Sequence, residues 1–296
     1  MRLLSFTCFL GLLLLSSCED LANLGIVIPK VVIDTRVEAG KSPEVTVRVV
    51  DQYGQTLRSY DLESSTVTLQ QDQSEAIVFG LTASSDSSAT FSSDCIIEAN
   101  TRYTLLINSP DLDEVRSITD VPDAVSVIVQ DPSGEFGPKG GLLPKDNVFH
   151  LPLSFSDVDI GLDNRYHLVV TVIDLTSPES AVDPLEITFG LFPPPSDVSR
   201  FNDTGWMFSD KDFRDGIFSA VVLINKEDVV QFAEPSVNVE IRSVSVDYFN
   251  FHRQNSRPKS STLIDLSISG SNNVEGGTGL FGGVASTNST FLLEFR

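Results

Sequence analysis

The stretch Val237-Asn238-Val239-Glu240-Ile241-Arg242 alternates branched apolar side chains with polar ones. Successive side chains of a β-strand point to opposite faces, so this spacing gives one apolar and one polar face, as in a half-buried antiparallel strand. The same alternation occurs over residues 45–49 and 66–70. Polar turn residues separate such runs, for example Ser84-Ser85-Asp86-Ser87-Ser88. The pattern predicts a mainly β protein.

A length of 296 residues favours two domains, with one large β domain as the alternative. Strand-like runs over residues 30–122 predict an immunoglobulin- or transthyretin-like β-sandwich. Residues 123–296 are expected to form a second β-rich domain, with the boundary near Val121-Pro122-Asp123. One short helix is expected from Val244 to Arg253, and a weaker helical pattern runs from Lys226 to Phe232.

The charge balance excludes one class of partner. The chain has 20 Lys and Arg residues against 41 Asp and Glu residues, a formal net charge of -21. Such a chain repels phosphate backbones, and it contains no basic patch, so we expect no nucleic-acid partner. A hydrophobic fraction of 41% is enough to form hydrophobic cores and excludes disorder of the whole chain.

The first residues form a targeting signal. Arg2 precedes an apolar run from Leu3 to Leu15, which is too short for a membrane span of about 20 residues but typical of a secretory signal. The run ends in Leu15-Ser16-Ser17-Cys18, which resembles the bacterial lipobox. That resemblance implies a signal peptide over residues 1–17, lipidation of Cys18 with palmitate among its chains, and a tether over residues 18–29. An ordinary cleavage site or a buried N-terminal helix are the alternatives.

Removal of the signal and lipidation of Cys18 leave Cys95 as the one unmodified cysteine of the chain. An intrachain disulfide is then excluded, and the fold of the exported protein must be stabilised by its hydrophobic cores. Cys95 precedes Ile96 and Ile97 and is expected to be a small buried apolar residue.

Three segments of the second half, residues 206–216, 237–251 and 272–283, together resemble the Bacteroidota lipoprotein family catalogued as domain of unknown function 4249. The resemblance implies an outer-membrane lipoprotein with an N-terminal immunoglobulin-like sandwich and a second β-rich domain. It implies a non-enzymatic accessory subunit beside a TonB-dependent receptor, bound to outer-membrane lipid, and supplies no catalytic residues. Glu19-Asp20 resembles the acidic export signals of surface lipoproteins, which favours the external over the periplasmic face of the outer membrane.

The segment Gly277-Thr278-Gly279-Leu280-Phe281-Gly282 matches the spacing G-x-G-x-x-G. A dinucleotide site also needs a following helix and an acidic residue about 20 positions on. Only 14 residues follow Gly282, and they lead into a strand-like run over residues 291–295, so we expect no nucleotide site. The expected structure is a tight loop in which glycines take positive φ while Leu280 and Phe281 fill an apolar pocket.

Asp157, Asp159 and Asp163 have an oxygen-rich spacing that calcium can use, and residues 210–215 hold a second Asp cluster. Neither cluster meets the EF-hand pattern, and such clusters more often form turns. Calcium is therefore a weak candidate, and we expect no cofactor besides the lipid.

Trp206, Phe192 and Phe208 are the candidate ligand surface, because exposed aromatic rings bind sugars and peptides. Packing of these rings into the core is the favoured alternative. His167 is expected to point outward from a strand. A surface adhesin or a glycan- or peptide-binding module is the second functional hypothesis, and a hydrolase built from dispersed Asp, Glu, Ser or His is the least favoured.

Overall fold

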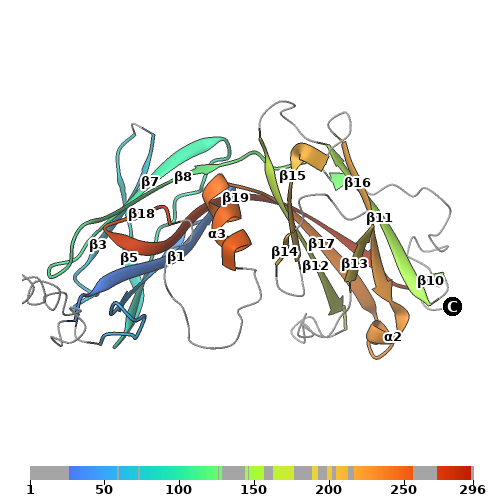
Figure 1. Cartoon of the computed structure of the whole chain (residues 1–296), viewed down its shortest axis with the longest axis horizontal. Helices are drawn as coiled ribbons and strands as arrows, with labels where there is room; N and C mark the ends of the chain where they lie inside the picture. Colours follow the sequence, from blue (N-terminus) through green and yellow to red (C-terminus); the bar gives the residue numbers. More distant parts are fainter. Residues whose placement is uncertain are drawn as a thin grey trace, which may run out of the picture.

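The structure is a computed structural model. It describes residues 27–58, 60–72, 74–125, 127–128, 144–145, 147–156, 163–176, 189–192, 199–201, 205–212, 217–255 and 272–294. These residues form two β lobes side by side, with one helix between them, α3 (Val246–Asn255) (Figure 1). The predicted mainly β fold class is confirmed. Among the described residues, no helix has both the length and the apolar character needed to span a membrane.

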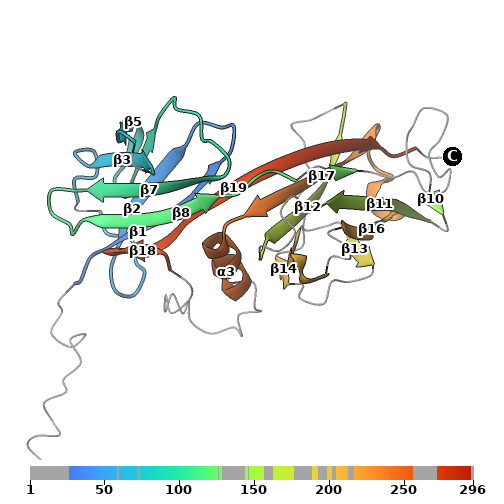
Figure 2. The same cartoon turned by 90° about the horizontal axis from the view of Figure 1, so that it is seen from above.

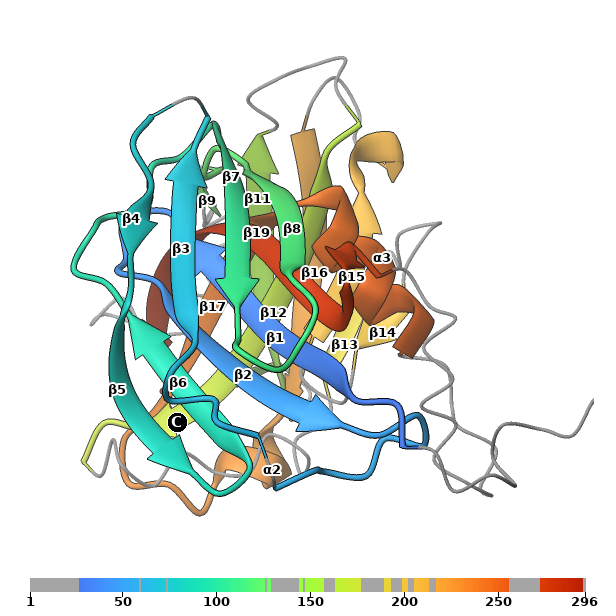
Figure 3. The same ribbon diagram turned by 90° about the vertical axis from the view of Figure 1, so that its left-hand side faces the viewer.

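The first lobe is a sandwich of two sheets (Figure 3). One sheet contains β1 (Lys30–Glu38), β2 (Glu44–Val50), β6 (Ser88–Ser92) and β5 (Gly80–Ser85). The other contains β18 (Val274–Glu275), β8 (Val115–Val121), β7 (Thr101–Asn108), β3 (Thr66–Gln71) and β4 (Ile77–Val78). The predicted alternation over residues 45–49 is confirmed, because Val45, Val47 and Val49 are fully buried between the sheets.

The second lobe packs two further groups of strands on a separate core. One group contains β14 (Ser199–Phe201), β15 (Gly205–Ser209), β12 (Arg165–Asp174) and β17 (Pro235–Val244). The facing sheet contains β10 (Pro144–Lys145), β11 (Val148–Ser156), β16 (Ile217–Asn225) and β13 (Phe189–Phe192), and β9 (Val127–Ile128) also pairs with β11. Val237, Val239 and Ile241 are fully buried in this core, as their alternation predicts.

One long strand, β19 (Gly277–Leu292), joins the two lobes (Figure 2). Its first part pairs in parallel with β1, from Val31↔Gly277 to Glu38↔Val284. Its second part pairs antiparallel with β17, from Val244↔Val284 to Ser236↔Leu292. The result is a nine-stranded sheet that runs through both lobes.

The chain therefore returns to its first lobe near its end. A boundary at residue 122 assigns residues 274–284 to the second domain, whereas the strand pairing places them in both sheets of the first lobe. Parallel pairing requires a long crossover connection. Here that connection, residues 39–276, includes the other strands of the first lobe as well as the whole second lobe, and no local sequence pattern reveals it.

Helix α3 matches the expected helix to within two residues at each end. The weaker helical pattern corresponds to α2 (Lys226–Val229), and a 3-10 helix, η4 (Asp210–Asp212), follows β15. The Ser245 hydroxyl accepts hydrogen bonds from the N–H groups of Tyr248 (3.3 Å) and Gly283 (3.1 Å). Tyr248 and Phe249 pack with residues of β15, β17 and β19 in a third apolar cluster. Helix α3 therefore packs against the junction at which β19 passes from one lobe to the other.

The expected glycine loop is wrong, because residues 277–292 form a strand. Leu280 and Phe281 are buried as expected, but they point into two different clusters, one under α3 and one inside the first lobe. Side chains alternate across a strand, so neighbouring residues serve opposite faces. Gly279 does have a positive φ of 113°.

A candidate binding cleft at the junction of the two lobes

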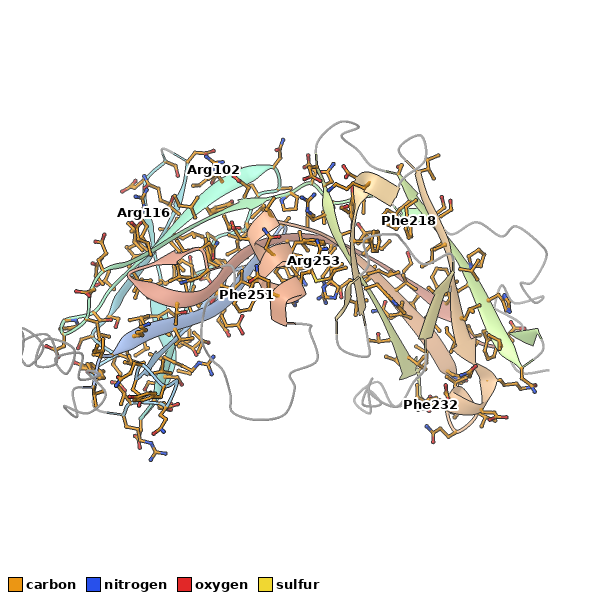
Figure 4. All side chains as sticks on the ribbon, in the orientation of Figure 1. Arg102, Arg116, Phe218, Phe232, Phe251 and Arg253 are labelled. Atoms are coloured by element: carbon orange, nitrogen blue, oxygen red, sulfur yellow. The ribbon has the colours of Figure 1, made fainter. Side chains whose placement is uncertain are left out.

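The sequence-predicted ligand surface does not form as an exposed patch. Trp206 is 5% exposed and Phe208 is fully buried. Phe208 stacks on Phe218 with ring centroids 4.6 Å apart, and Figure 4 labels Phe218 in the second lobe. Phe192 lies on β13, but its side chain is outside the described part of the chain. Trp206 and Phe208 project from the same face of β15 into the core, where aromatic burial is most stabilising.

The other candidates fall partly outside the described residues. Cys18, Asp157 and Asp159 all lie there. Asp163 forms a two-point ion pair with Arg165, and this hydrogen bonding holds the pKa of Asp163 below its usual range. Among the residues that the structure describes, no group of three or more His, Cys, Asp or Glu side chains is placed to hold a metal ion. Cys95 is half-buried, rather than buried as expected.

His167 is buried, at 3% exposure, so the expectation that it points outward is wrong. Its side chain lies on the polar face of β12, which α3 covers, and its Nδ1 lies 3.3 Å from the hydroxyl of Tyr248. Burial, reinforced by the positive charge of Arg242, lowers the pKa of His167 to about 3. The covering helix follows about 80 positions later in the sequence, so the alternation around His167 gives no sign of it.

A cleft of about 460 Å³ opens at the junction of the lobes. The first lobe contributes the start of β7 and the end of β8, including Arg102 and Asp120. The second lobe contributes the start of β12, and the corner between β17 and α3 contributes residues 243–247. The strand β19 and the helix α3 join the elements that form the two sides of the cleft.

The floor of the cleft combines apolar groups with one notable hydroxyl. Val125 and Tyr166 extend from the second core, at 3% and 1% exposure. Ser243 follows Ile241 on the same face of β17, at 5% exposure. Its hydroxyl has no hydrogen-bond partner in the described part of the chain. Some other described hydroxyl groups are fully buried and have no partner, but the Ser243 hydroxyl is not among these fully buried groups. The Ser243 hydroxyl is therefore open to the cleft.

Two ion pairs occupy the arginines of the rim. Arg102 donates from Nε to Asp120 Oδ1 (2.8 Å) and from Nη2 to Asp120 Oδ2 (3.1 Å). Arg165 is held in the same two-point manner by Asp163. Such bidentate pairs are geometrically specific, and each guanidinium group is committed to a neighbouring carboxylate.

Three further carboxylates line the cleft, those of Asp72, Asp123 and Asp247, and none has an ion-pair partner among the described residues. The cleft therefore has five carboxylates against two guanidinium groups. The pKa of Asp247 is raised, first by burial and then by the negative charge of Asp120, although a hydrogen bond with Asn273 opposes the shift. Negative charge at this site is poorly compensated by the protein itself.

The sequence did not predict the cleft, because the residues that line it come from separate segments, around positions 72, 101, 121, 164 and 245. Each segment reads locally as a polar turn or a strand end. The one available signal was the Asp cluster that ends at Asp163, which does lie at the rim.

A family model described as "Domain of unknown function (DUF4249)" matches residues 26–290. A comparison with curated proteins gave no match. Among solved structures, the chain is similar to a DUF4785 family protein from Legionella pneumophila subsp. pneumophila str. Philadelphia 1, with 11% identity and a TM-score of 0.27. The match covers 75% of this chain and 54% of that one, so the chain spans about half of that structure's length. At that TM-score the similarity does not bear on fold or function.

Proposed function

This chain belongs to the family catalogued as domain of unknown function 4249. We propose that it is an outer-membrane lipoprotein, because its N-terminal apolar run ends in a lipobox-like Ser16-Ser17-Cys18. In this proposal it is a non-enzymatic binding and accessory subunit beside a TonB-dependent transporter, and the junction cleft is its binding site. The cleft is the observation that carries the binding role. Its volume of about 460 Å³ lies within the range of about 300–1,000 Å³ that is typical of small-molecule sites.

The sequence supports the anchor. The apolar run from Leu3 to Leu15 ends in the lipobox-like Ser16-Ser17-Cys18, and β1 begins at Lys30. Even fully extended, a tether over residues 18–29 spans roughly 40 Å. The first lobe would then stay close to the membrane surface, where a transporter could contact it.

The way in which the two lobes are joined supports a binding role. The nine-stranded sheet is continuous through β19, and α3 is tied to that strand by the hydrogen bonds between Ser245 and Gly283. A preorganised cleft binds with a smaller entropy cost than one that must be assembled. The glycan-binding alternative relied on exposed aromatic rings, and Trp206 and Phe208 are buried.

The anchor is tested by substituting each of the three cysteines separately in cells fed with a labelled palmitate analogue. Cys18→Ser is expected to abolish the label and to release the protein from the outer-membrane fraction, because one lipidated residue holds it there. Cys8→Ser and Cys95→Ser are matched controls that should keep both properties. Outer-membrane retention of unlabelled Cys18→Ser protein would contradict the proposal.

The side of the membrane is tested on intact cells with an added protease. The external location that we favour predicts that the protein is digested without lysis. Replacement of Glu19 and Asp20 by Ala should move the protein to the periplasmic face, where it is digested only after the cells are opened. Protection of the wild-type protein in intact cells would contradict the external location.

A further inference from the structure

We propose that the junction cleft binds an organic cation, with an ammonium or guanidinium group held between Asp123 and Asp247 and within reach of the Ser243 hydroxyl. This inference rests on the proposed function, because it names the class of ligand that the same cleft takes. Neither the family match nor the sequence patterns assign such a ligand.

The first observation is electrostatic. Arg102 and Arg165 are each held by a two-point ion pair with an aspartate, so they have little capacity left to attract an anion. Asp72, Asp123 and Asp247 have no such partner in the described residues. The cleft therefore has an excess of negative charge, and such an excess attracts ligands of the opposite sign.

The behaviour of Asp247 supports the same conclusion. Burial and the neighbouring charge of Asp120 raise the pKa of Asp247, so its ionised form is disfavoured in the empty cleft. A bound cation offsets both effects, because it supplies opposite charge and hydrogen-bond donors. An anionic ligand adds to the repulsion instead.

The second observation is the Ser243 hydroxyl, which does not depend on charge. The residue is 5% exposed, yet its hydroxyl has no partner in the described part of the chain. Buried polar groups nearly always have a hydrogen-bond partner, so an open hydroxyl at the floor of a cleft indicates a place for a ligand group. A hydroxyl oxygen accepts the N–H donors that ammonium and guanidinium groups offer.

The cleft fits an organic cation better than a metal ion. Its volume is far larger than a single ion needs, and the described residues include no metal-binding group of three His, Cys, Asp or Glu side chains. Val125 and Val244 line the cleft beside the polar groups. Apolar walls next to carboxylates suit a cation with a methylene stem, such as a polyamine or a lysine side chain.

Isothermal titration calorimetry on the full lipidated chain in non-ionic detergent micelles tests the inference. Spermidine represents a free polyamine, and the peptide acetyl-Gly-Lys-Gly-amide represents a polypeptide side chain. We expect one binding site per chain and an affinity that falls as salt is added, because the attraction is screened. Stronger binding of spermidine indicates a free amine as the source, and stronger binding of the peptide indicates a protein partner.

The variants locate the binding. Asp123→Asn combined with Asp247→Asn should weaken binding about tenfold, and Ser243→Ala should weaken it about fivefold, as expected for the loss of weak ion pairs and of one hydrogen bond. The matched control combines Asp86→Asn with Asp94→Asn, which removes the same charge from exposed first-lobe residues outside the cleft. This control should bind as the wild type does. Unchanged unfolding midpoints show that all variants are folded.

Three outcomes would overturn the inference. The first is that neither probe binds the folded wild type, and the second is that the Asp123 and Asp247 variant binds as tightly as its control. The third is displacement of the probe by stoichiometric calcium chloride, which would assign the cleft to a metal. None of these outcomes decides the proposed function, because co-purification with a transporter is measured without any ligand.

Discussion

Gly279 lies directly against Ile33, so that a Cβ atom at position 279 would overlap the backbone carbonyl of Ile33. The two residues are register partners in the parallel pairing of β1 with β19. Gly276 and Gly283 make equally close approaches to the backbone of Glu114 and of Asp120. These glycines therefore let the chain pair with β1 in one sheet of the first lobe while its backbone lies against residues 114–121 of the other sheet, and their role is structural.

Substitution of Gly279 should destabilise the protein strongly. Gly279→Ala introduces a Cβ both at a φ of 113° and into the backbone of Ile33, so we expect a loss of about 2 kcal/mol or more in the free energy of unfolding. Urea unfolding followed by tryptophan fluorescence and circular dichroism measures it. Gly80→Ala is the control, because nothing lies within 4 Å of a Cβ there, and an equal effect of both substitutions would contradict this role.

Stability should fall steeply with pH below 6.5. Burial is the main cause that lowers the pKa of His167 to about 3 and that of His252 to about 4, with the charges of Arg242 and Arg36 adding to it. The unfolded chain binds protons at these histidines near pH 6.5, whereas the folded chain does not, so stability is lost as the pH falls from 6.5 toward 4.

The variant His167→Gln isolates this effect, since it keeps a neutral polar side chain under α3. Between pH 7 and pH 5 the wild type should lose about 2 kcal/mol more stability than the variant does. His150→Gln, on β11, is the control for the loss of a histidine elsewhere in the second lobe. The same pH profile for His167→Gln and the wild type would show that His167 is protonated in the folded state.

Asp174 holds the end of β12 to the start of β17. Its carboxylate accepts hydrogen bonds from the Thr176 hydroxyl (2.7 Å) and from the N–H groups of Thr176, Ala233 and Glu234. These bonds, led by that of the Thr176 hydroxyl, lower the pKa of Asp174 to about 2. Asp174→Asn should therefore lower the unfolding temperature at pH 7, whereas Asp86→Asn should not. Calorimetric scans that show no difference would contradict this role.

The burial of the aromatic cluster is tested by truncation. Phe208 is fully buried against Phe155 and Phe218, so Phe208→Ala should cost about 3–5 kcal/mol. Ile217→Ala removes a side chain that is 48% exposed and should cost less than about 1 kcal/mol. Equal and small effects would indicate that Phe208 is exposed, as a ligand surface would require.

Local sequence patterns predicted the elements of the fold well. The alternation in residues 45–49 and 237–242 identifies strands whose apolar residues are fully buried, and helix α3 lies where its pattern indicated. These features depend on neighbours within a few residues. The return of β19 to β1 connects residues about 245 positions apart, and nothing in the local pattern of Gly277 to Gly283 distinguishes this strand from a loop.

The candidate site was not predictable for the same reason. The polar character of Asp120, Asp163 and Asp247 is visible in the sequence, but their meeting at one cleft depends on how β19 and α3 join the lobes. The apparent exposure of His167 was wrong because the polar face of β12 is covered by a distant helix. Burial of a polar residue by a remote element leaves no periodic signal.

The most direct test of the proposed function is to isolate the lipidated protein from mildly solubilised outer membranes and to quantify the co-purifying proteins by mass spectrometry. We expect a TonB-dependent receptor at about one copy per chain, lost in Cys18→Ser and kept in Cys95→Ser. Recovery of the lipidated protein alone, from membranes in which such receptors are abundant, would contradict the role of an accessory subunit.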